Sequence, residues 1–157
     1  MDMFEKRRFA IVQACAAGFR EADDIMVSQL MGAAKRLMEQ AGFHVSPLAE
    51  QLRPVVMLAC SQEALDFLEA RGADAIYGWG VCLIGDVSRD DVIVHELVHH
   101  YQGIWTDSRP SDKSMPYQKR WEESQAFLIQ RADKPPVDGS AGSIRPSTLV
   151  ASKTFWR

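Results

Sequence analysis

Apolar residues recur at helical spacing in the N-terminal part of the chain. Residues 4–18 are predicted to form a first helix. Residues 23–41 are predicted to form a second, because Asp23 or Asp24 can cap its start and Gly42 can end it. The apolar residues that define this second helix are Met26, Leu30, Ala33, Leu37 and Met38. The region is therefore expected to supply two flanking helices.

The pattern changes to short apolar runs in the middle of the chain. Residues 55–60 form one such run, which is typical of a buried strand, and Ser61 can cap a helix over 62–71. Two more runs follow, separated by a glycine-rich connection over 78–80. We predict a pair of neighbouring strands here, the second of them over 81–84.

Helical spacing returns in the next segment. Ser88, with Asp91 three positions later, resembles a capping box, and Gly103 follows the last helical position. One side of the intervening helix is apolar and contains Val94, Leu97, Val98 and Tyr101. Pro116 then suits the first turn of a final helix over 117–132.

These elements, helices together with a few short strands, predict an α/β (α+β) fold. A length of 157 residues fits one domain with a real core. The C-terminal tail is rich in Pro, Gly and Ser and is expected to be irregular. We expect a single domain over 1–157 in three parts: N-terminal helices over 1–45, a core over 54–132 and the irregular tail over 133–157.

Composition and charge narrow the class of protein. The chain is 46% hydrophobic and 25% charged, as in ordinary soluble domains, and its net charge of −3 does not indicate a nucleic-acid surface. No apolar run is long enough to span a bilayer. Lys6-Arg7-Arg8 before an apolar stretch resembles a signal peptide, but Gln13 interrupts that stretch and a first helix fits better. We expect a cytoplasmic protein, with export as the open alternative.

The cysteines resemble neither a disulfide framework nor a zinc-finger set. They are odd in number and widely spaced, at Cys15, Cys60 and Cys82. Reduced thiols are the expected state. A Cys60–Cys82 bridge between neighbouring strands is the alternative that would suit an exported protein.

Three of the four histidines fall in one stretch, which contains the H-E-x-x-H pattern as His95-Glu96-Leu97-Val98-His99. Positions i and i+4 share one face of a helix, so both imidazoles can reach one metal ion. Glu96 lies about 100° round the helix, where it can hold a metal-bound water without being a ligand. Two imidazoles, a water and a carboxylate base are the parts of a hydrolytic zinc site. A helix that matches the pattern by chance would explain only its apolar residues.

A catalytic zinc site usually has three protein ligands, so a third is expected elsewhere. The extended motif H-E-x-x-H-x-x-G-x-x-H is absent, because Gln102 and Trp105 occupy its last two defined positions. The remaining candidates are the carboxylates of Glu123, Glu122 and Asp107. Glu123 is favoured, because Ala126 one turn later would let two helices pack closely around an ion. The alternative for the adjacent glutamates is an ordinary solvated helix face.

The two motifs together resemble a known family. His95-Glu96-Leu97-Val98-His99, followed by Glu123-Ser124-Gln125-Ala126, is similar to the signature of the gluzincin metallopeptidases, H-E-x-x-H with a downstream E-x-x-A. The resemblance covers roughly residues 75–130, and the small size of the chain is similar to that of the minimal members of the group.

This resemblance implies a zincin-like fold, with a small mixed sheet beside an active-site helix and a cleft beneath an edge strand. It implies His95, His99 and Glu123 as the ligands of one zinc ion, and Glu96 as general base and acid. Glu122 stays the runner-up to Glu123 from the packing argument above. The sequence departs from the larger members of the family because no His or Tyr follows Glu123 to stabilise an oxyanion. The residues of these types nearby come earlier, at His100, Tyr101 and Tyr117.

The predicted function is a zinc-dependent peptidase that acts on a peptide or protein substrate. Water on the zinc would attack the peptide carbonyl, and Glu96 would take its proton and return it to the leaving nitrogen. The strand over 81–84 could pair with an extended substrate, as edge strands do. No substrate-binding side chain and no oligomeric state are predicted. The alternative is a non-catalytic, zinc-stabilised zincin-like module that binds or regulates a partner and has no need of Glu96.

Overall fold

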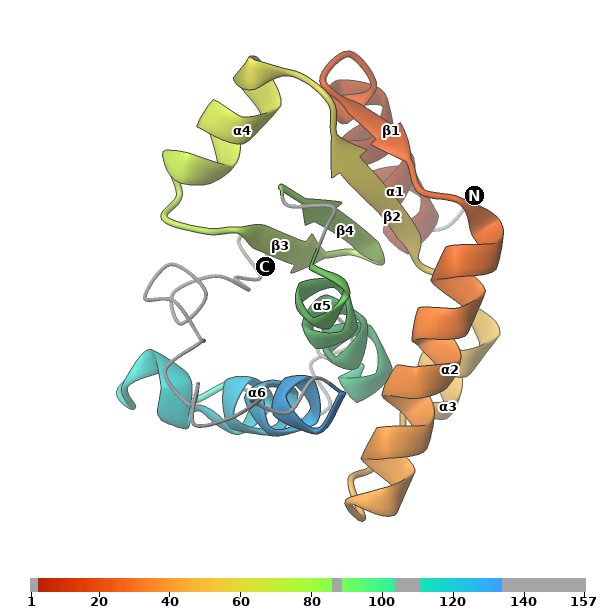
Figure 1. Ribbon diagram of the computed structural model, residues 1–157, viewed down its shortest axis with the longest axis vertical. Helices are drawn as coiled ribbons and strands as arrows, with labels where there is room; N and C mark the ends of the chain where they lie inside the picture. Colours follow the sequence, from red (N-terminus) through yellow and green to blue (C-terminus); the bar gives the residue numbers. More distant parts are fainter. Residues whose placement is uncertain (1–2, 86–88, 104–110, 134–157) are drawn as a thin grey trace.

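The computed structural model describes residues 3–85, 89–103 and 111–133. Its elements in chain order are α1 (Met3–Cys15), β1 (Phe19–Glu21), α2 (Asp24–Gln40), α3 (Pro47–Gln51), β2 (Val55–Ala59), α4 (Gln62–Glu69), β3 (Ala75–Gly78), β4 (Val81–Ile84), α5 (Asp90–Gln102), the 3₁₀ turn η2 (Tyr117–Lys119) and α6 (Trp121–Asp133). They form one small α+β domain in which helices pack on a mixed sheet, as predicted (Figure 1). Among these helices, none has the length and apolar content that crossing a bilayer requires.

The sheet has the strand order β1-β2-β4-β3. β2 and β4 are parallel, whereas β1 pairs antiparallel with β2 and β3 pairs antiparallel with β4. β3 and β4 are the predicted neighbouring strands, and Trp79 and Gly80 join them. Both of these residues have positive φ, 51° and 76°. This is the backbone that a tight two-residue hairpin turn requires.

β2, β3 and β4 are apolar along their length because both faces of the sheet are covered there, whereas the edge strand β1 has only Phe19 buried. Successive side chains of a strand point to opposite faces. Accordingly, Val56 and Leu58 of β2 belong to one buried cluster and Met57 between them belongs to the other. The first cluster lies against α2, α5 and α6, and the second against α1 and α4 (Figure 1). Each face therefore has a core of its own.

α5 is the most enclosed helix of the described chain, and every one of its residues from Val92 to Gln102 is buried. It packs against β3 and β4 on one side and against α2 and α6 on the others (Figure 1). Gly103 ends it with φ of 68°, the left-handed conformation that glycine adopts without strain. The apolar stripe was therefore a correct prediction, but the polar side of this helix is buried as well.

The predicted helix starts are confirmed for α2 and α4. The Asp23 carboxylate accepts hydrogen bonds from the backbone N–H groups of Ile25 and Met26, at 2.9 and 3.0 Å. Ser61 Oγ accepts one from the N–H of Ala64 at 3.1 Å. Both caps satisfy backbone donors that the first turn of a helix leaves unpaired.

Two predicted starts differ from the structure. Pro116 precedes the short 3₁₀ turn η2, and α6 begins only at Trp121, because Arg120 has the extended ψ of 141° and interrupts the helix. α5 has Arg89 at its N-cap position with no side-chain cap, and the predicted cap Ser88 lies outside the described residues. The elements β1 and α3 were not predicted, because three and five residues are too few for a periodic pattern.

The prediction that the strand over 81–84 offers a free edge is wrong. This strand is β4, and it pairs with β2 on one side and β3 on the other over its whole length. Its backbone groups are already used in the sheet, so it cannot take up an added strand. Within the described residues the edge strands are β1 and β3.

The alternative of a Cys60–Cys82 bridge is also wrong. Cys82 is buried in β4 and lies opposite Val56 of β2, whereas Cys60 follows the end of β2 and is exposed. Four residues of strand correspond to about 13 Å. A disulfide requires Cα atoms about 4.4–6.8 Å apart, so the two thiols cannot meet.

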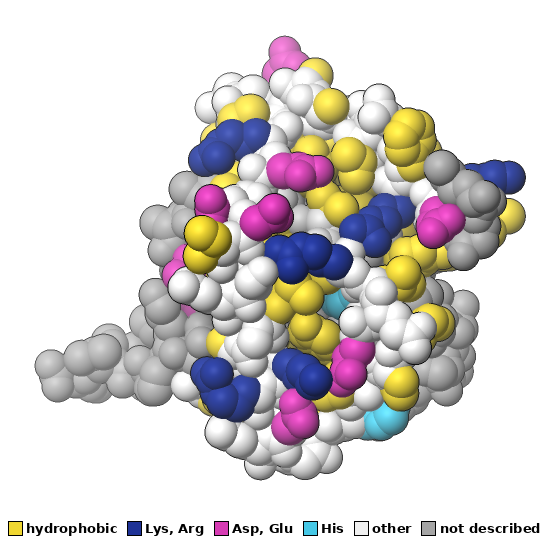
Figure 2. Space-filling model, turned by 90° about the vertical axis from the view of Figure 1, so that its right-hand side faces the viewer, with side chains coloured by type: hydrophobic (Ala, Val, Ile, Leu, Met, Phe, Trp, Pro, Cys, Tyr) yellow, Lys and Arg dark blue, Asp and Glu magenta, His cyan; other side chains and the backbone are white. Residues whose placement is uncertain are grey.

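The face formed largely by α2 and α3 carries Lys and Arg side chains interspersed with Asp and Glu (Figure 2). Two exposed ion pairs lie here, Lys35–Glu50 at 3.2 Å and Arg53–Asp24 at 3.6 Å. Exposed pairs of this kind contribute about 0–1 kcal/mol to stability. This face shows no concentration of one sign of charge.

Candidate metal centre

The H-E-x-x-H residues of α5 lie in the interior of the domain. His95 is 1% exposed, and Glu96 and His99 are 0% exposed. Ionisable side chains are seldom buried to this degree unless they are paired or bind a metal. The enclosed position of α5 therefore shields three ionisable side chains from solvent, so their interaction partners must come from the protein or from a bound ion.

Glu123 joins the two histidines from α6. Its Oε1 atom lies 3.1 Å from Nε2 of His95 and 3.1 Å from Nε2 of His99. The three ligand atoms all lie within 4.8 Å of one another, and Glu123 is 2% exposed. The structure thus brings His95, His99 and Glu123 together as a buried group that could hold a metal ion.

The packing of α5 against α6 explains how Glu123 reaches the histidines. Ala126, one turn after Glu123, is 0% exposed and belongs to the cluster formed by α2, α5, α6 and one face of the sheet. A side chain of this size allows the two helix backbones to approach. This is the arrangement on which the choice of Glu123 from the sequence depended.

The other carboxylates considered from the sequence do not join this group in the described chain. Glu122 is buried, but its Oε1 accepts a hydrogen bond from the Ser111 hydroxyl. The described metal-binding group contains Glu123 and not Glu122. Asp107 lies outside the described residues.

Two glutamines contact the outer nitrogens of the histidines. Gln130 Oε1 lies 2.7 Å from Nδ1 of His95, and Gln102 Oε1 lies 2.9 Å from Nδ1 of His99. Neither glutamine was predicted from the sequence to belong to the site. Gln130 was recognisable in principle, because it follows Glu123 by seven positions and two helical turns bring it to the same face of α6.

The three residues of the metal-binding group differ in how their surroundings shift their pKa values. Burial acts to lower the pKa of His99, but the Glu123 carboxylate outweighs it and raises that pKa to about 9. Burial lowers the pKa of His95 although the Glu123 carboxylate lies beside its Nε2 atom, and the charge on His99 adds to the lowering. Burial would raise the pKa of Glu123, but His99 and His95 lower it. At neutral pH the metal-free group therefore holds one proton on His99 beside an ionised Glu123.

Tyr117 also contacts the metal-binding group, a role that was not predicted from the sequence. Burial raises its pKa well above the usual range, and the Glu123 and Glu96 carboxylates, together with its hydrogen bond to Glu123, raise it further. Its hydroxyl therefore remains protonated and can act only as a neutral donor or acceptor. The residue lies in η2, which has no helical relation to Glu123, so its spacing in the sequence gave no signal.

His100, the third histidine of the stretch, has a structural role. Its Nε2 donates to the backbone oxygens of Ala49 and Leu52, at 3.0 and 2.7 Å, and its Nδ1 accepts from the Tyr77 hydroxyl at 3.0 Å. Burial lowers its pKa to about 4, so it is neutral at pH 7. His100 thus ties α5 to α3 and β3, away from the metal-binding group.

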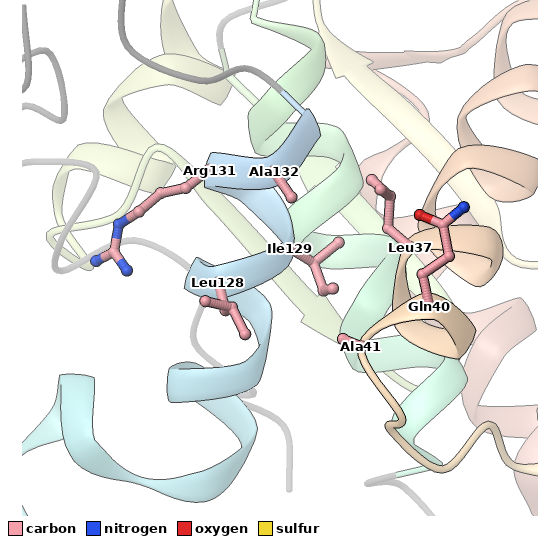
Figure 3. A pocket seen from close by; sticks show the side chains of 7 residues that line it. All are labelled: Leu37, Gln40, Ala41, Leu128, Ile129, Arg131 and Ala132. Carbon is pink, nitrogen blue, oxygen red and sulfur yellow. The ribbon is translucent and has the colours of Figure 1, made fainter.

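A separate groove of about 440 Å³ lies between the C-terminal parts of α2 and α6 (Figure 3). Two of its lining side chains, Gln40 and Arg131, are polar or charged. The others are apolar: Leu37, Ala41, Leu128, Ile129 and Ala132. None of these residues belongs to the metal-binding group. The groove offers neither a metal ligand nor a carboxylate, so it does not extend the candidate site.

The donor set fits a borderline transition metal. Two imidazole nitrogens and one carboxylate oxygen are ligands that zinc accepts, and nickel, cobalt and iron accept them as well. Three buried donors that converge on one point require a positive charge between them, which a proton or a metal ion can supply. The geometry thus supports a metal ion without naming it.

No protein-family profile matches the chain, and neither the curated proteins nor the solved structures contain a significant match. The function is therefore inferred from the residues of the site.

We expect His95→Ala or His99→Ala to abolish stoichiometric metal binding, because either change removes one of three ligands and one of the two imidazoles beside the buried Glu123 carboxylate. Elemental analysis of the purified variants measures the metal directly. A His44→Ala variant, which changes an exposed histidine, is the control and should bind as the parent does. Full metal retention in both ligand variants would contradict the assignment.

The structure makes a sharper prediction for the two neighbouring glutamates. Glu123→Ala should weaken zinc binding by more than the ~10–100-fold that losing an outer partner of a ligand typically costs. Glu122→Ala should have a much smaller effect, because Glu122 contacts Ser111 rather than the histidines. Competition with a chelator ranks the two variants, and equal retention or the reverse order would show that Glu123 is not the third ligand.

Proposed function

We propose that the protein is a zinc-dependent peptidase of the gluzincin type. The observation that carries this proposal is the buried group of His95, His99 and Glu123, with the carboxylate of Glu96 beside it. A site that only holds an ion has no need of this additional carboxylate, whereas hydrolysis needs a base at this place. The resemblance of both motifs to the gluzincin signature agrees with this ligand set.

The proposed reaction divides the work between the ion and two side chains, those of Glu96 and Tyr117. Zinc, when bound, would polarise the scissile carbonyl and lower the pKa of water. Glu96 takes the proton of the attacking water and returns it to the leaving nitrogen. It lies one residue after His95 on α5, so the helix that supplies two ligands also fixes the base.

Tyr117 is the residue that we assign to oxyanion stabilisation, the role for which no His or Tyr follows Glu123 in the sequence. It contacts Glu123, so its hydroxyl lies at the edge of the metal-binding group. The hydroxyl stays protonated because burial and the nearby carboxylates raise its pKa. A neutral hydroxyl at this position can donate a hydrogen bond to the oxyanion that forms when the carbonyl is attacked. No residue after Glu123 is then required for this role.

Tyr117→Phe should lower kcat by about 10²-fold or more while zinc content stays at the parental level, because one oxyanion donor is typically worth about 10²–10³ in rate. Steady-state kinetics on a cleaved peptide give kcat and KM separately. Tyr101→Phe is the matched control, since Tyr101 is buried on α5 outside the metal-binding group. A normal kcat in Tyr117→Phe would exclude Tyr117 from catalysis.

A second candidate function is a non-catalytic, metal-stabilised module. The near-complete burial of His95, His99 and Glu123 favours it, because structural zinc sites are closed whereas catalytic ones keep a position open. The two candidates share their ligands and differ in what they require of Glu96. Only the peptidase loses its function when that carboxylate is replaced.

The test is to measure zinc and hydrolysis in the same purified protein. The parent should hold one zinc ion per chain and cleave members of a mixed peptide library, with Glu96→Gln as the blank. Zinc without cleavage of any peptide, in a protein that remains folded, would support the metal-stabilised module. A protein that binds no zinc would contradict both candidate functions.

A further inference from the structure

We propose that Gln130 and Gln102 are positioning residues that hold both histidines with Nε2 directed at the metal-binding group. The inference rests on the metal-binding part of the proposed function and does not depend on peptidase activity. Each glutamine places its side-chain oxygen against the Nδ1 atom of one histidine, at 2.7 Å for His95 and 2.9 Å for His99. The amide nitrogen of each glutamine has its own hydrogen-bond partner, which fixes the orientation of the amide.

Asp91 fixes the orientation of Gln130. The amide nitrogen of Gln130 donates to Oδ2 of Asp91 at 2.9 Å, and the same oxygen lies 3.2 Å from the Arg89 guanidinium. An ionised carboxylate only accepts hydrogen bonds, so the nitrogen end of the amide must face Asp91. The oxygen end then faces His95, whose Nδ1 must carry the hydrogen. The Nε2 lone pair of His95 is left for the ion.

The backbone of α6 fixes Gln102 in the same way. Its amide nitrogen donates to the backbone oxygen of Glu122 at 2.9 Å and to Oε1 of Gln125 at 3.2 Å. A backbone carbonyl is also an acceptor only. The oxygen of Gln102 therefore faces Nδ1 of His99, and the Nε2 atoms of His99 and His95 are directed at the same carboxylate oxygen. Two separate sets of hydrogen bonds thus keep a hydrogen on Nδ1 of both histidines.

Amides at these positions also control the charge of the site. A metal-ligating histidine commonly donates its outer N–H to a carboxylate or a backbone carbonyl. Here both acceptors are neutral amides, so they add no negative charge to that of the Glu123 carboxylate. A neutral acceptor leaves the imidazole less electron-rich than a carboxylate does, so a bound ion remains the stronger Lewis acid.

Gln130→Leu tests the positioning role, because leucine fills similar space and offers no acceptor. We expect zinc affinity, measured by chelator competition, to fall about 10–100-fold, as is typical when an outer partner of a ligand is lost. Gln62→Leu is the matched control. Gln62 also donates to an aspartate at 2.9 Å, that of Asp66, but it lies on α4 on the other face of the sheet. It should bind zinc as the parent does.

A spectroscopic readout separates positioning from a general loss of packing. In ¹⁵N spectra of the histidine side chains, the parent should show a hydrogen on Nδ1 of both His95 and His99. Gln130→Leu should lose the protected Nδ1–H signal of His95 and keep that of His99. An unfolded or loosened variant would instead lose both signals.

Exchanging the two partners provides a rescue. Gln130→Glu alone places a second carboxylate opposite Asp91 and should weaken zinc binding. Adding Asp91→Asn supplies an amide that can donate to the new carboxylate, whose other oxygen accepts from His95. The double variant should recover zinc affinity to within about threefold of the parent, a coupling that two independent changes would not show.

Two outcomes would overturn the proposal. One is a Gln130→Leu variant that binds zinc as tightly as the parent and keeps the Nδ1–H signal of His95. The other is a Gln62→Leu control that loses as much affinity as Gln130→Leu. If the parent binds no zinc, the proposed function fails, and the histidine spectrum of the metal-free protein still decides the inference: Nδ1–H on His95 in the parent and its loss in Gln130→Leu support it, and any other pattern contradicts it.

Discussion

Replacing Glu96 with glutamine should leave zinc in place and lower hydrolysis by at least two orders of magnitude. Glutamine keeps the size of the side chain and one of its oxygens, but an amide cannot accept the proton of the attacking water. A general base is worth about 10²–10⁴-fold in rate, which sets the expected loss. Glu96 is not among the three convergent ligands, so the ion should remain. Zinc content and kcat are measured on the same sample.

Glu122→Gln is the matched control for this experiment. It makes the same change at a second buried glutamate, close to the ligands but directed at Ser111. We expect its kcat to stay within about threefold of the parent, since it touches none of the reacting groups. If Glu96→Gln holds zinc and cleaves as well as the parent, Glu96 is not the base. A comparable loss in both variants would indicate a general disturbance of α6 and α5 instead.

The metal-binding group could be found in the sequence because helical geometry constrains most of it. His95 and His99 lie one turn apart on one helix, so their spacing alone brings their side chains together. The choice of Glu123 over Glu122 needed a packing argument, and Ala126 supplied it because a buried alanine marks where two helices approach. In each case a local rule was sufficient to place the residue in three dimensions.

Tyr117 and Gln102 could not be found by such rules. Tyr117 reaches Glu123 from a 3₁₀ turn whose direction is set by the extended backbone at Arg120, and no periodicity records that direction. Gln102 lies at the end of α5, where its spacing from His99 fits a plain helix surface equally well. Their roles arise from contacts between segments that are distant in the sequence, which only the folded chain defines.

The same limit explains the errors in the fold. The apolar run over 81–84 was correctly predicted as a strand, but the order of strands in a sheet depends on pairings between distant segments. β2 reaches β4 through the crossover that contains α4 and β3, and this makes β4 an interior strand. The position of Cys82 opposite Val56 follows from that register and excludes the bridge to Cys60.

The pH dependence of zinc binding is the second prediction with a large effect. Near neutral pH, His99 carries a proton because Glu123 raises its pKa to about 9, whereas the lowered pKa values of His95 and Glu123 leave those two groups without one. A metal ion needs the lone pair of His99, so each binding event must release that proton. We expect zinc affinity to rise about tenfold per pH unit between about pH 6.5 and 8.

Calorimetric titrations in buffers of different ionisation enthalpy count the released protons directly. About one proton per zinc ion is expected at pH 7. His44→Ala is the control, because His44 is exposed and lies outside the metal-binding group. Its removal should leave the proton count unchanged. Binding without proton release would mean that His99 is already neutral in the metal-free protein.

The same proton gives metal-free and zinc-loaded protein opposite responses to pH. The folded pKa of His99 lies above its ordinary value of 6.5, so its contribution to the stability of the metal-free protein is complete below pH 6.5 and is lost as the pH rises through about 9. Zinc stabilises the fold in proportion to the logarithm of its affinity, which increases over the same interval. Thermal unfolding with and without zinc should therefore show a difference in Tm that widens from pH 6.5 to 8. A constant difference would place the released proton elsewhere than on His99.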